Sequence, residues 1–300
     1  MRKTTLLKEL ILADELLVMP AAFDPLSAKI VAEAGFPAVQ CTGLGISVTT
    51  LGLPDYGVLG MTDMVERTAR IVEAVDLPVM ADADTGFGNA VNVAFAARAF
   101  ERIGAAGFNL EDQVAPKRCG HLAGKELVSV EEMVGKIAAA RDALSDPDFV
   151  LNARTDALAV EGIEGAVRRG NAYLQAGATM AYVDAIETLE QVRAIRTRLD
   201  GPLGVSMVEG GRTSSTLTFA ALQEAGVARV SLSLTLLLAS VHAMRRVLAT
   251  VRETGRASGY ADQVADFKEL QRFFGMDEVL SLERRFLPGE QLARKYGDAA

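Results

Sequence analysis

The hexapeptide PKRCGH at 116–121 places one thiol among side chains that can carry positive charge. Cationic neighbours stabilise a thiolate and lower the pKa of a cysteine, so this thiol can act as an acid or as a thiolate near neutral pH. A glycine beside it lets the backbone pass close to a ligand. A basic surface loop with an inert cysteine is the alternative interpretation. The residues concerned are Lys117, Arg118, Cys119, Gly120 and His121.

Acidic side chains form a second chemical signal, because they follow short apolar stretches at several places in the chain. They are Asp82, Asp84, Glu111, Asp112, Asp156, Asp184 and Glu209. Gathering many carboxylates at one buried place is costly unless a cation joins them. Mg²⁺ commonly takes one or two carboxylates and completes its shell with water and substrate oxygens. Each acid alone is also compatible with a helix cap, but the repetition favours a shared site.

Asp82 and Asp84 are separated by one small residue on a predicted strand. Successive side chains of a strand point to opposite faces, so residues two apart point the same way. We expect both acids to approach one cation only if the strand ends and the chain bends at Asp84, which Thr85-Gly86 permits.

Eight short apolar stretches alternate with longer helical patterns along the chain. This alternation predicts an α/β fold, a closed (β/α)8 barrel of the TIM type, whose active sites lie at the carboxyl ends of the strands. The predicted strands are 17–23, 38–42, 78–83, 107–111, 149–154, 180–184, 203–208 and 229–234. The predicted helices are 26–34, 62–74, 90–103, 130–143, 162–176, 189–199 and 218–225, with an additional helix at 4–13 before the first strand.

Length and composition limit the class of protein. A chain of 300 residues, of which 50% are hydrophobic, is predicted to form one domain over 1–300. The absence of a long apolar run or a signal-peptide core predicts a cytoplasmic protein without membrane contact. A net charge of −8 and no tryptophan argue against a nucleic-acid partner and leave small anionic molecules as ligands. Two cysteines form no disulfide framework.

The tail from 255 to 300 is charged but carries apolar residues at helical spacing, among them Val264, Phe267, Leu270, Phe273 and Phe274. An apolar helix face must be buried against another element. We expect this helical tail to pack on a partner subunit.

Four linked strings resemble the isocitrate lyase and phosphoenolpyruvate mutase superfamily. They are MADADTGFGNAVNV at 80–93, LEDQVAPKRCGH at 110–121, GKELV and EEM within 124–133, and NARTDA at 152–157. The resemblance covers nearly the whole chain and is strongest to the methylisocitrate lyase, 2,3-dimethylmalate lyase and carboxyphosphonoenolpyruvate mutase group. It implies a barrel whose eighth helix is swapped between subunits, a homotetramer built as a dimer of dimers, Mg²⁺ or Mn²⁺, and a mobile loop that carries the cysteine.

The resemblance also implies roles for individual residues. Asp82 and Asp84 match the metal-site aspartates, Asp55 matches a further acid of that site, and Glu111 matches the glutamate on its strand-four side. Arg154 matches the arginine that binds the α-oxyacid end, and Thr42, Gly43 and Gly45 match a turn whose amides hold a substrate carboxylate. The implied catalytic residues are Lys117, Arg118, Cys119, His121 and Glu111. The implied substrate-binding residues are Thr42, Gly43, Gly45, Asp55, Gly120, Arg154, Asp184, Ser206, Glu209 and Ser233.

The activity implied is the cleavage of a 2-hydroxy di- or tricarboxylate, of the 2,3-dimethylmalate or 2-methylisocitrate type, into a 2-oxoacid such as pyruvate and a carboxylate. An enediolate forms and Cys119 protonates it. Related mutases typically lack this cysteine loop, so Cys119 favours a lyase. A carboxyphosphonoenolpyruvate-type phosphonomutase, an oxaloacetate hydrolase and a barrel scaffold with a degenerate site are the alternatives.

Several positions depart from the pattern of many lyases of this group. Asn109 replaces a histidine, Asp184 a glutamate and Ser206 an asparagine. Gly210-Gly211 and Ser233 replace the phenylalanine-containing and proline-containing segments of methylisocitrate lyases. These changes favour a substrate other than methylisocitrate, such as a dialkylmalate or oxaloacetate.

Overall fold

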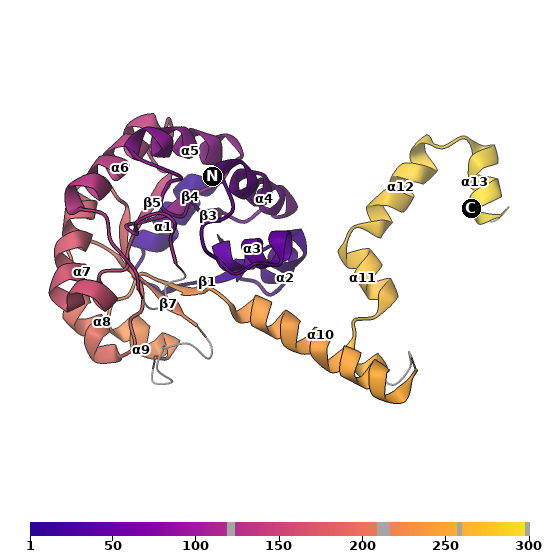
Figure 1. Cartoon of the computed structure of the whole chain (residues 1–300). Helices are drawn as coiled ribbons and strands as arrows, with labels where there is room; N and C mark the ends of the chain where they lie inside the picture. Colours follow the sequence, from indigo (N-terminus) through magenta and orange to yellow (C-terminus); the bar gives the residue numbers. More distant parts are fainter. Residues whose placement is uncertain (119–123, 209–216, 257–259, 298–300) are drawn as a thin grey trace. The chain divides into compact units, whose positions relative to one another are not determined.

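The computed structural model describes residues 1–118, 124–208, 217–256 and 260–297. Eight parallel strands pair in chain order and β1 pairs with β8, so the sheet closes into a barrel. The predicted fold is confirmed, and helices surround the strands (Figure 1). The strands are β1 (Leu17–Ala22), β2 (Val39–Cys41), β3 (Val79–Asp82), β4 (Gly107–Glu111), β5 (Val150–Thr155), β6 (Met180–Val183), β7 (Leu203–Met207) and β8 (Arg229–Leu232).

Helix α1 (Lys3–Leu12) precedes β1, and α10 (Thr235–Thr254) follows β8. The helices around the barrel are α2 (Pro25–Glu33), α3 (Gly43–Leu51), α4 (Met61–Ala74), α5 (Ala90–Arg102), α6 (Val130–Ala143), α7 (Leu158–Gln175), α8 (Leu189–Arg196) and α9 (Phe219–Glu224). The structure adds α3, which sequence patterning does not predict, because this segment contains two glycines and a β-branched Val-Thr-Thr run. Gly162 has a left-handed φ of 72° and divides α7. The regular part of this helix therefore begins near residue 162, where the predicted helix 162–176 begins.

The period of two along each strand separates the outer core from the interior of the barrel. On β4, Phe108 packs in the core against Phe100 and Phe149, with ring centroids 5.8 and 5.4 Å apart. The alternate residue Asn109 lines the cavity described below. The same alternation therefore makes a hydrophobic layer under the helices and a polar layer inside the barrel.

Helix α1 supplies the apolar side chains that close the amino-terminal end of the barrel. Leu7 and Ile11 are buried with Leu17, Met80 and Val150, which lie near the beginning of their strands. Because this end is filled with apolar side chains, the polar groups of the interior are accessible from the carboxyl ends of the strands.

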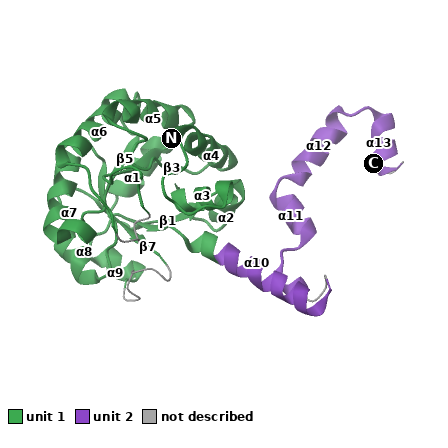
Figure 2. Ribbon diagram, in the orientation of Figure 1, with its two compact units in different colours: residues 1–238 green, residues 239–300 purple. Residues whose placement is uncertain are grey.

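The chain divides into two compact units, residues 1–238 and residues 239–300 (Figure 2). The first contains the barrel. The second contains most of α10, the short 3-10 helix η1 (Ala261–Gln263), α11 (Phe267–Phe273), α12 (Met276–Phe286) and α13 (Gly289–Tyr296). In the described parts of the chain, no helix has the length and apolarity that a bilayer crossing requires.

Candidate active site

One cavity at the carboxyl ends of the strands contains most of the predicted site residues. Ten of them line it: Thr42, Gly43, Asp55, Asp82, Lys117, Arg118, Arg154, Asp184, Ser206 and Ser233. Asp84 and Glu111 are buried directly beside it and contact Lys117 and Arg154, respectively. Gly45 is buried in the first turn of α3. Cys119, Gly120, His121 and Glu209, together with Gly210-Gly211, lie outside the described residues.

Arg154 on β5 is surrounded by carboxylates from three strands. Its guanidinium contacts both carboxylate oxygens of Asp156, at 2.9 and 3.0 Å, in a bidentate pair. Asp184 lies 3.2 Å and Glu111 3.4 Å from it. Glu111 and Arg154 are directly opposite in the β4–β5 register, which explains their approach. The Arg154 side chain keeps 18% exposure and lines the cavity, so the guanidinium can also meet a ligand.

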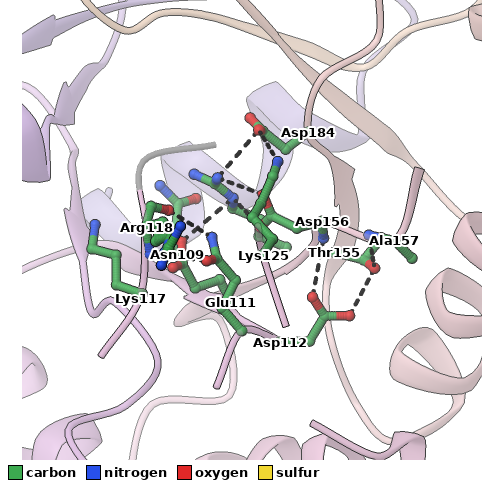
Figure 3. A network of polar contacts seen from close by, with 12 residues as sticks. Asn109, Glu111, Asp112, Lys117, Arg118, Lys125, Thr155, Asp156, Ala157 and Asp184 are labelled. Atoms are coloured by element: carbon green, nitrogen blue, oxygen red, sulfur yellow. Dashed lines mark hydrogen bonds and ion pairs between the residues drawn. The ribbon is translucent and has the colours of Figure 1, made fainter. Parts of the chain in front are cut away.

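Lys125 belongs to the same network, although sequence reasoning assigned it no role. Its ammonium lies 2.9 Å from Asp156 and 3.7 Å from Asp184 (Figure 3). Burial raises the pKa of a carboxyl group, but Arg154 and Lys125 lower the pKa of Asp156 well below its ordinary value. Asp156 is therefore a permanent anion that holds two cations. The sequence signals for Asp156 were its place after a predicted strand and in the NARTDA string.

Lys117 forms a second charged contact at the cavity, with acids from other segments of the chain. Its ammonium lies 2.6 Å from Asp55 and 2.7 Å from Asp84, and its side chain is 5% exposed. Burial opposes its charge, but Asp84 and Glu111 raise the pKa of Lys117 well above its ordinary value. Burial also raises the pKa of Asp84, to about 6, against the opposing effect of Lys117.

The backbone bends at Asp84, as the close approach of two acids to one point requires. Strand β3 ends at Asp82, and Asp84 has a left-handed φ of 46°. The Asp84 amide donates to Asp82 Oδ1 at 3.1 Å. Gly86 follows with a φ of 88°, and a Cβ there would lie 2.3 Å from Val93 Cγ2. The turn thus needs Gly86, and it brings the two acids to the same side of the cavity.

The amino terminus of α3 faces Asp82. Thr42 caps this helix by accepting from the Gly45 amide at 3.2 Å, and the Gly43 amide donates to Asp82 Oδ2 at 2.9 Å. A Cβ on Gly43 would lie 2.6 Å from the same oxygen. Both amides are engaged within the chain, and their binding of a substrate carboxylate stays a prediction.

Asp112 sits behind the network and fixes the end of β5. Its carboxylate accepts from Thr155 Oγ1 at 2.7 Å and from the Asp156 amide at 3.0 Å (Figure 3). It also accepts from Tyr173 Oη at 2.7 Å. Arg169 lies 3.4 Å away. Burial raises the pKa of Asp112, and these hydrogen bonds oppose the shift. Asp112 therefore positions Asp156, which in turn orients Arg154.

Polar side chains continue from this cluster along the interior of the barrel. Ser206 and Ser233 share a hydrogen bond of 2.7 Å across β7 and the end of β8. Asn109, where many lyases have histidine, accepts from the Asn152 side-chain amide. Gln40, Tyr182 and Ser231 also line the cavity, and sequence reasoning did not select them. The alternation of Arg229, Ser231 and Ser233 along one strand was the signal that could have found this wall.

The charged cluster is rich in acids. Its acidic members are Asp55, Asp82, Asp84, Glu111, Asp156 and Asp184, and its basic members are Lys117, Lys125 and Arg154. Burial raises the pKa of Glu111 well above its ordinary value, and its Oε1 has no hydrogen-bond partner among the described residues. An excess of buried carboxylate oxygens favours an additional cation.

The donor set fits Mg²⁺ or Mn²⁺. The described residues contain no preformed group of three or more His, Cys, Asp or Glu metal ligands. Mg²⁺ does not require one, because it is usually held by one or two carboxylates together with water and substrate oxygens. Asp82 and Asp84 are the residues that would hold it, with Glu111 and Asp55 close to them.

Comparison with known proteins relates the chain as a whole to characterised enzymes. A family model described as phosphoenolpyruvate phosphomutase matches residues 7–252. The chain is 41% identical to 2,3-dimethylmalate lyase of Eubacterium barkeri over 283 residues, which cover 94% of this chain and 98% of that protein.

Solved structures are similar over nearly the whole chain as well. Oxaloacetate acetylhydrolase in complex with the inhibitor 3,3-difluorooxalacetate superposes with a TM-score of 0.88 at 32% identity, covering 94% of this chain and 96% of that one. Phosphonopyruvate hydrolase in complex with oxalate and Mg²⁺ superposes with a TM-score of 0.88 at 33% identity, covering 96% and 100%.

The close approach of Gly43 to Asp82 yields a testable prediction. Gly43→Ala would force the Asp82 carboxylate away, because the new Cβ would stand 2.6 Å from Oδ2. We expect Mn²⁺ affinity, measured by calorimetry, to fall at least about tenfold while the protein stays folded. Gly135→Ala, on a helix with nothing within 4 Å of its Cβ, is the control and should leave it unchanged. Equal Mn²⁺ affinity in both variants would contradict the assignment of Asp82.

Proposed function

The chain belongs to the phosphoenolpyruvate mutase and isocitrate lyase superfamily, and from this premise we propose that it is a Mg²⁺-dependent carbon–carbon lyase acting on a 2-hydroxydicarboxylate of the 2,3-dimethylmalate type. The observation that carries the proposal is the position of Arg154 beside the acid-rich cluster in one cavity. This arrangement offers a planar cation and a metal site to the two oxygen-rich ends of an α-hydroxyacid.

Arg154 binds the 2-carboxylate and the 2-hydroxyl end of the substrate in this proposal. Asp156 and Asp184, which follow β5 and β6, contact its guanidinium and support its orientation, and Lys125 contacts both of these acids. A bound Mg²⁺ supplies positive charge to the oxygens of the same end. Preorganised positive charge of this kind is usually the largest contribution to catalysis.

Cleavage breaks the bond between C2 and C3. The hydroxyl proton leaves to a base, the C2 oxygen becomes the carbonyl of a 2-oxoacid, and the bonding electrons move to C3 and its carboxylate as an enediolate. Protonation at C3 then yields the second carboxylate, so 2,3-dimethylmalate gives pyruvate and propionate. Lys117 contributes positive charge near the reacting groups, and the thiol of Cys119 is the proton donor.

Hydrolysis of oxaloacetate is a second candidate, favoured by the Ser206–Ser233 pair. These hydroxyl groups lie in the cavity and are hydrogen-bonded to each other, so one of them keeps an O–H to donate to a polar ligand and both can accept from it. A gem-diol form of a 2-oxoacid would use such groups, whereas an alkyl substituent would not. A phosphonomutase is separated from both by the formation of a carbon–phosphorus bond.

The direct test of the lyase is release of product from 2,3-dimethylmalate. We expect pyruvate, by a coupled lactate dehydrogenase assay, and propionate, by proton NMR, in equal amounts with Mg²⁺, and neither with excess EDTA. Cys119→Ser should lower turnover by ~10²–10⁴ for loss of a positioned acid.

The number of reactive thiols is a control for the Cys119 variant. Burial raises the pKa of Cys41 to about 12, so iodoacetamide should modify one thiol per folded chain, that of Cys119, and two after denaturation.

The products separate the alternative activities. Oxalate and acetate from oxaloacetate, without cleavage of dimethylmalate, would identify a hydrolase instead. A carbon–phosphorus product by phosphorus NMR, or full activity in EDTA, would reject the lyase.

The second unit is proposed to pack on a partner subunit within a homotetramer. Helices α11, α12 and α13 have 7, 11 and 8 residues and contain no buried residue. Helices this short are marginal in water without tertiary packing. Phe267 and Phe286 are 71% and 66% exposed in the single chain, which indicates a missing packing surface.

Light scattering tests this assembly. We expect the wild-type mass of a tetramer and a smaller species for the double variant Phe267→Glu, Phe286→Glu, because buried charge opposes association. Lys268→Glu, next to one of these positions but polar in both forms, is the control and should remain a tetramer. A monomeric wild type would contradict the proposal.

A further inference from the structure

Arg229 is a fully buried cation inside the barrel, on the first position of β8. Its side chain has no exposed surface, and it is the largest of the fully buried side chains. It is opposite Leu17 of β1 and Gly204 of β7 in the strand register. Ser231 of β8 and Ser233, which follows the strand, alternate with Arg229, and both line the active-site cavity.

The contacts of Arg229 are all neutral. Its guanidinium donates to Gln40 Oε1 at 2.9 Å, to Asn109 Oδ1 at 3.4 Å and to Ser231 Oγ, and it lies 2.8 Å from Met80 Sδ. Among the described residues, no carboxylate lies within ion-pair distance of it, and its Nε has no hydrogen-bond partner. Burial lowers the pKa of Arg229 to about 10, so it remains charged at neutral pH.

Arg154 provides an internal contrast. Both guanidinium groups approach the ring of Tyr182, at 5.9 Å for Arg154 and 5.3 Å for Arg229. Arg154 has three acids around it, whereas the described neighbours of Arg229 are dipoles, a thioether and an aromatic face. A buried charge without a counter-ion is strongly disfavoured, and packing alone would be satisfied by an apolar residue such as methionine.

The neighbours of Arg229 transmit its charge to the cavity. Gln40, Asn109 and Ser231 accept from the guanidinium and also line the cavity, so one layer of side chains separates Arg229 from a ligand. Because the oxygens of Asn109 and Ser231 accept from the cation, the N–H groups of Asn109 and the O–H group of Ser231 are available to donate to a ligand. This wall therefore offers hydrogen-bond donors to a ligand, and the positive charge of Arg229 behind these donors favours a negatively charged one.

We infer that Arg229 is a positioning residue that makes this wall selective for the second carboxylate of a dicarboxylate ligand. The inference deepens the proposed lyase function, since it rests on Arg154 binding the α-hydroxyacid end. It assigns the two guanidinium groups around Tyr182 to the two ends of a four-carbon dicarboxylate. The second end is bound through Asn109 and Ser231, with Arg229 behind them.

Matched ligands test the charge preference directly. Malate carries the second carboxylate, β-malamate replaces it with a neutral amide of the same shape, and 2-hydroxybutyrate replaces it with a methyl group. Calorimetry with the Mg²⁺-loaded protein should show malate bound at least about tenfold more tightly than either neutral ligand.

Variants assign the preference to Arg229. Arg229→Met should lower malate affinity about tenfold while changing β-malamate and 2-hydroxybutyrate little, and its denaturation midpoint should not fall, because a desolvated charge is removed. Arg229→Lys retains the charge and should keep most of the preference. Arg70→Met removes an arginine whose side chain is 71% exposed and should leave the preference unchanged.

Two results would overturn the inference. One is a wild-type protein that binds malate no better than β-malamate, a result that needs no variant to fold. The other is an Arg229→Met protein that loses affinity equally for all three ligands, as a purely structural residue would. Because binding requires no turnover, a protein that keeps the preference but cleaves no 2-hydroxydicarboxylate would contradict the proposed function alone.

Discussion

The balance of buried charge at the carboxyl ends of the strands is the constraint on which the rest of the site depends. Arg154 is held by acids from three strands, and Lys117 by Asp55 and Asp84. Removing one partner of such a pair leaves an uncompensated charge in a poorly solvated place, which is more costly than the pair itself is stabilising. The side chains are therefore fixed in position before any ligand arrives, and the remaining excess of acid favours a metal ion.

Much of the fold could be predicted from the sequence, because alternation of short apolar stretches with helical patterns reports burial directly. The acids at the strand ends were also accessible, since barrel topology places those ends together. Lys125 and Arg229 were missed for a physical reason. Lys125 lies in the loop before α6 and contacts Asp156 and Asp184, and Arg229 contacts residues of β2, β3 and β4 across the barrel interior, so both roles depend on tertiary contacts that no local sequence pattern reports.

The bend at Asp84 is a backbone feature that the local sequence indicates, whereas the helix after Thr42 depends on tertiary packing. Thr85-Gly86 indicated the bend, because glycine tolerates the left-handed backbone that follows. Helix α3 was not predicted, since its glycines and β-branched residues have low helix propensity and packing overrides that preference. Relatives with lyase and hydrolase names share this fold, so specificity must come from the side chains around the site rather than from the barrel; we propose Ser206, Ser233 and Arg229 as such side chains.

Crystals grown with Mn²⁺ and oxalate would test the central claim most directly, because Mn²⁺ is located by its anomalous scattering independently of any assay. The account predicts one strong peak per chain beside Asp82 and Asp84, with an oxalate carboxylate in contact with Arg154. It also predicts that Asp156 and Asp184 still hold that guanidinium. A cavity without Mn²⁺, with oxalate bound away from Arg154, would contradict the claim that the buried charges form one metal and acid-binding site.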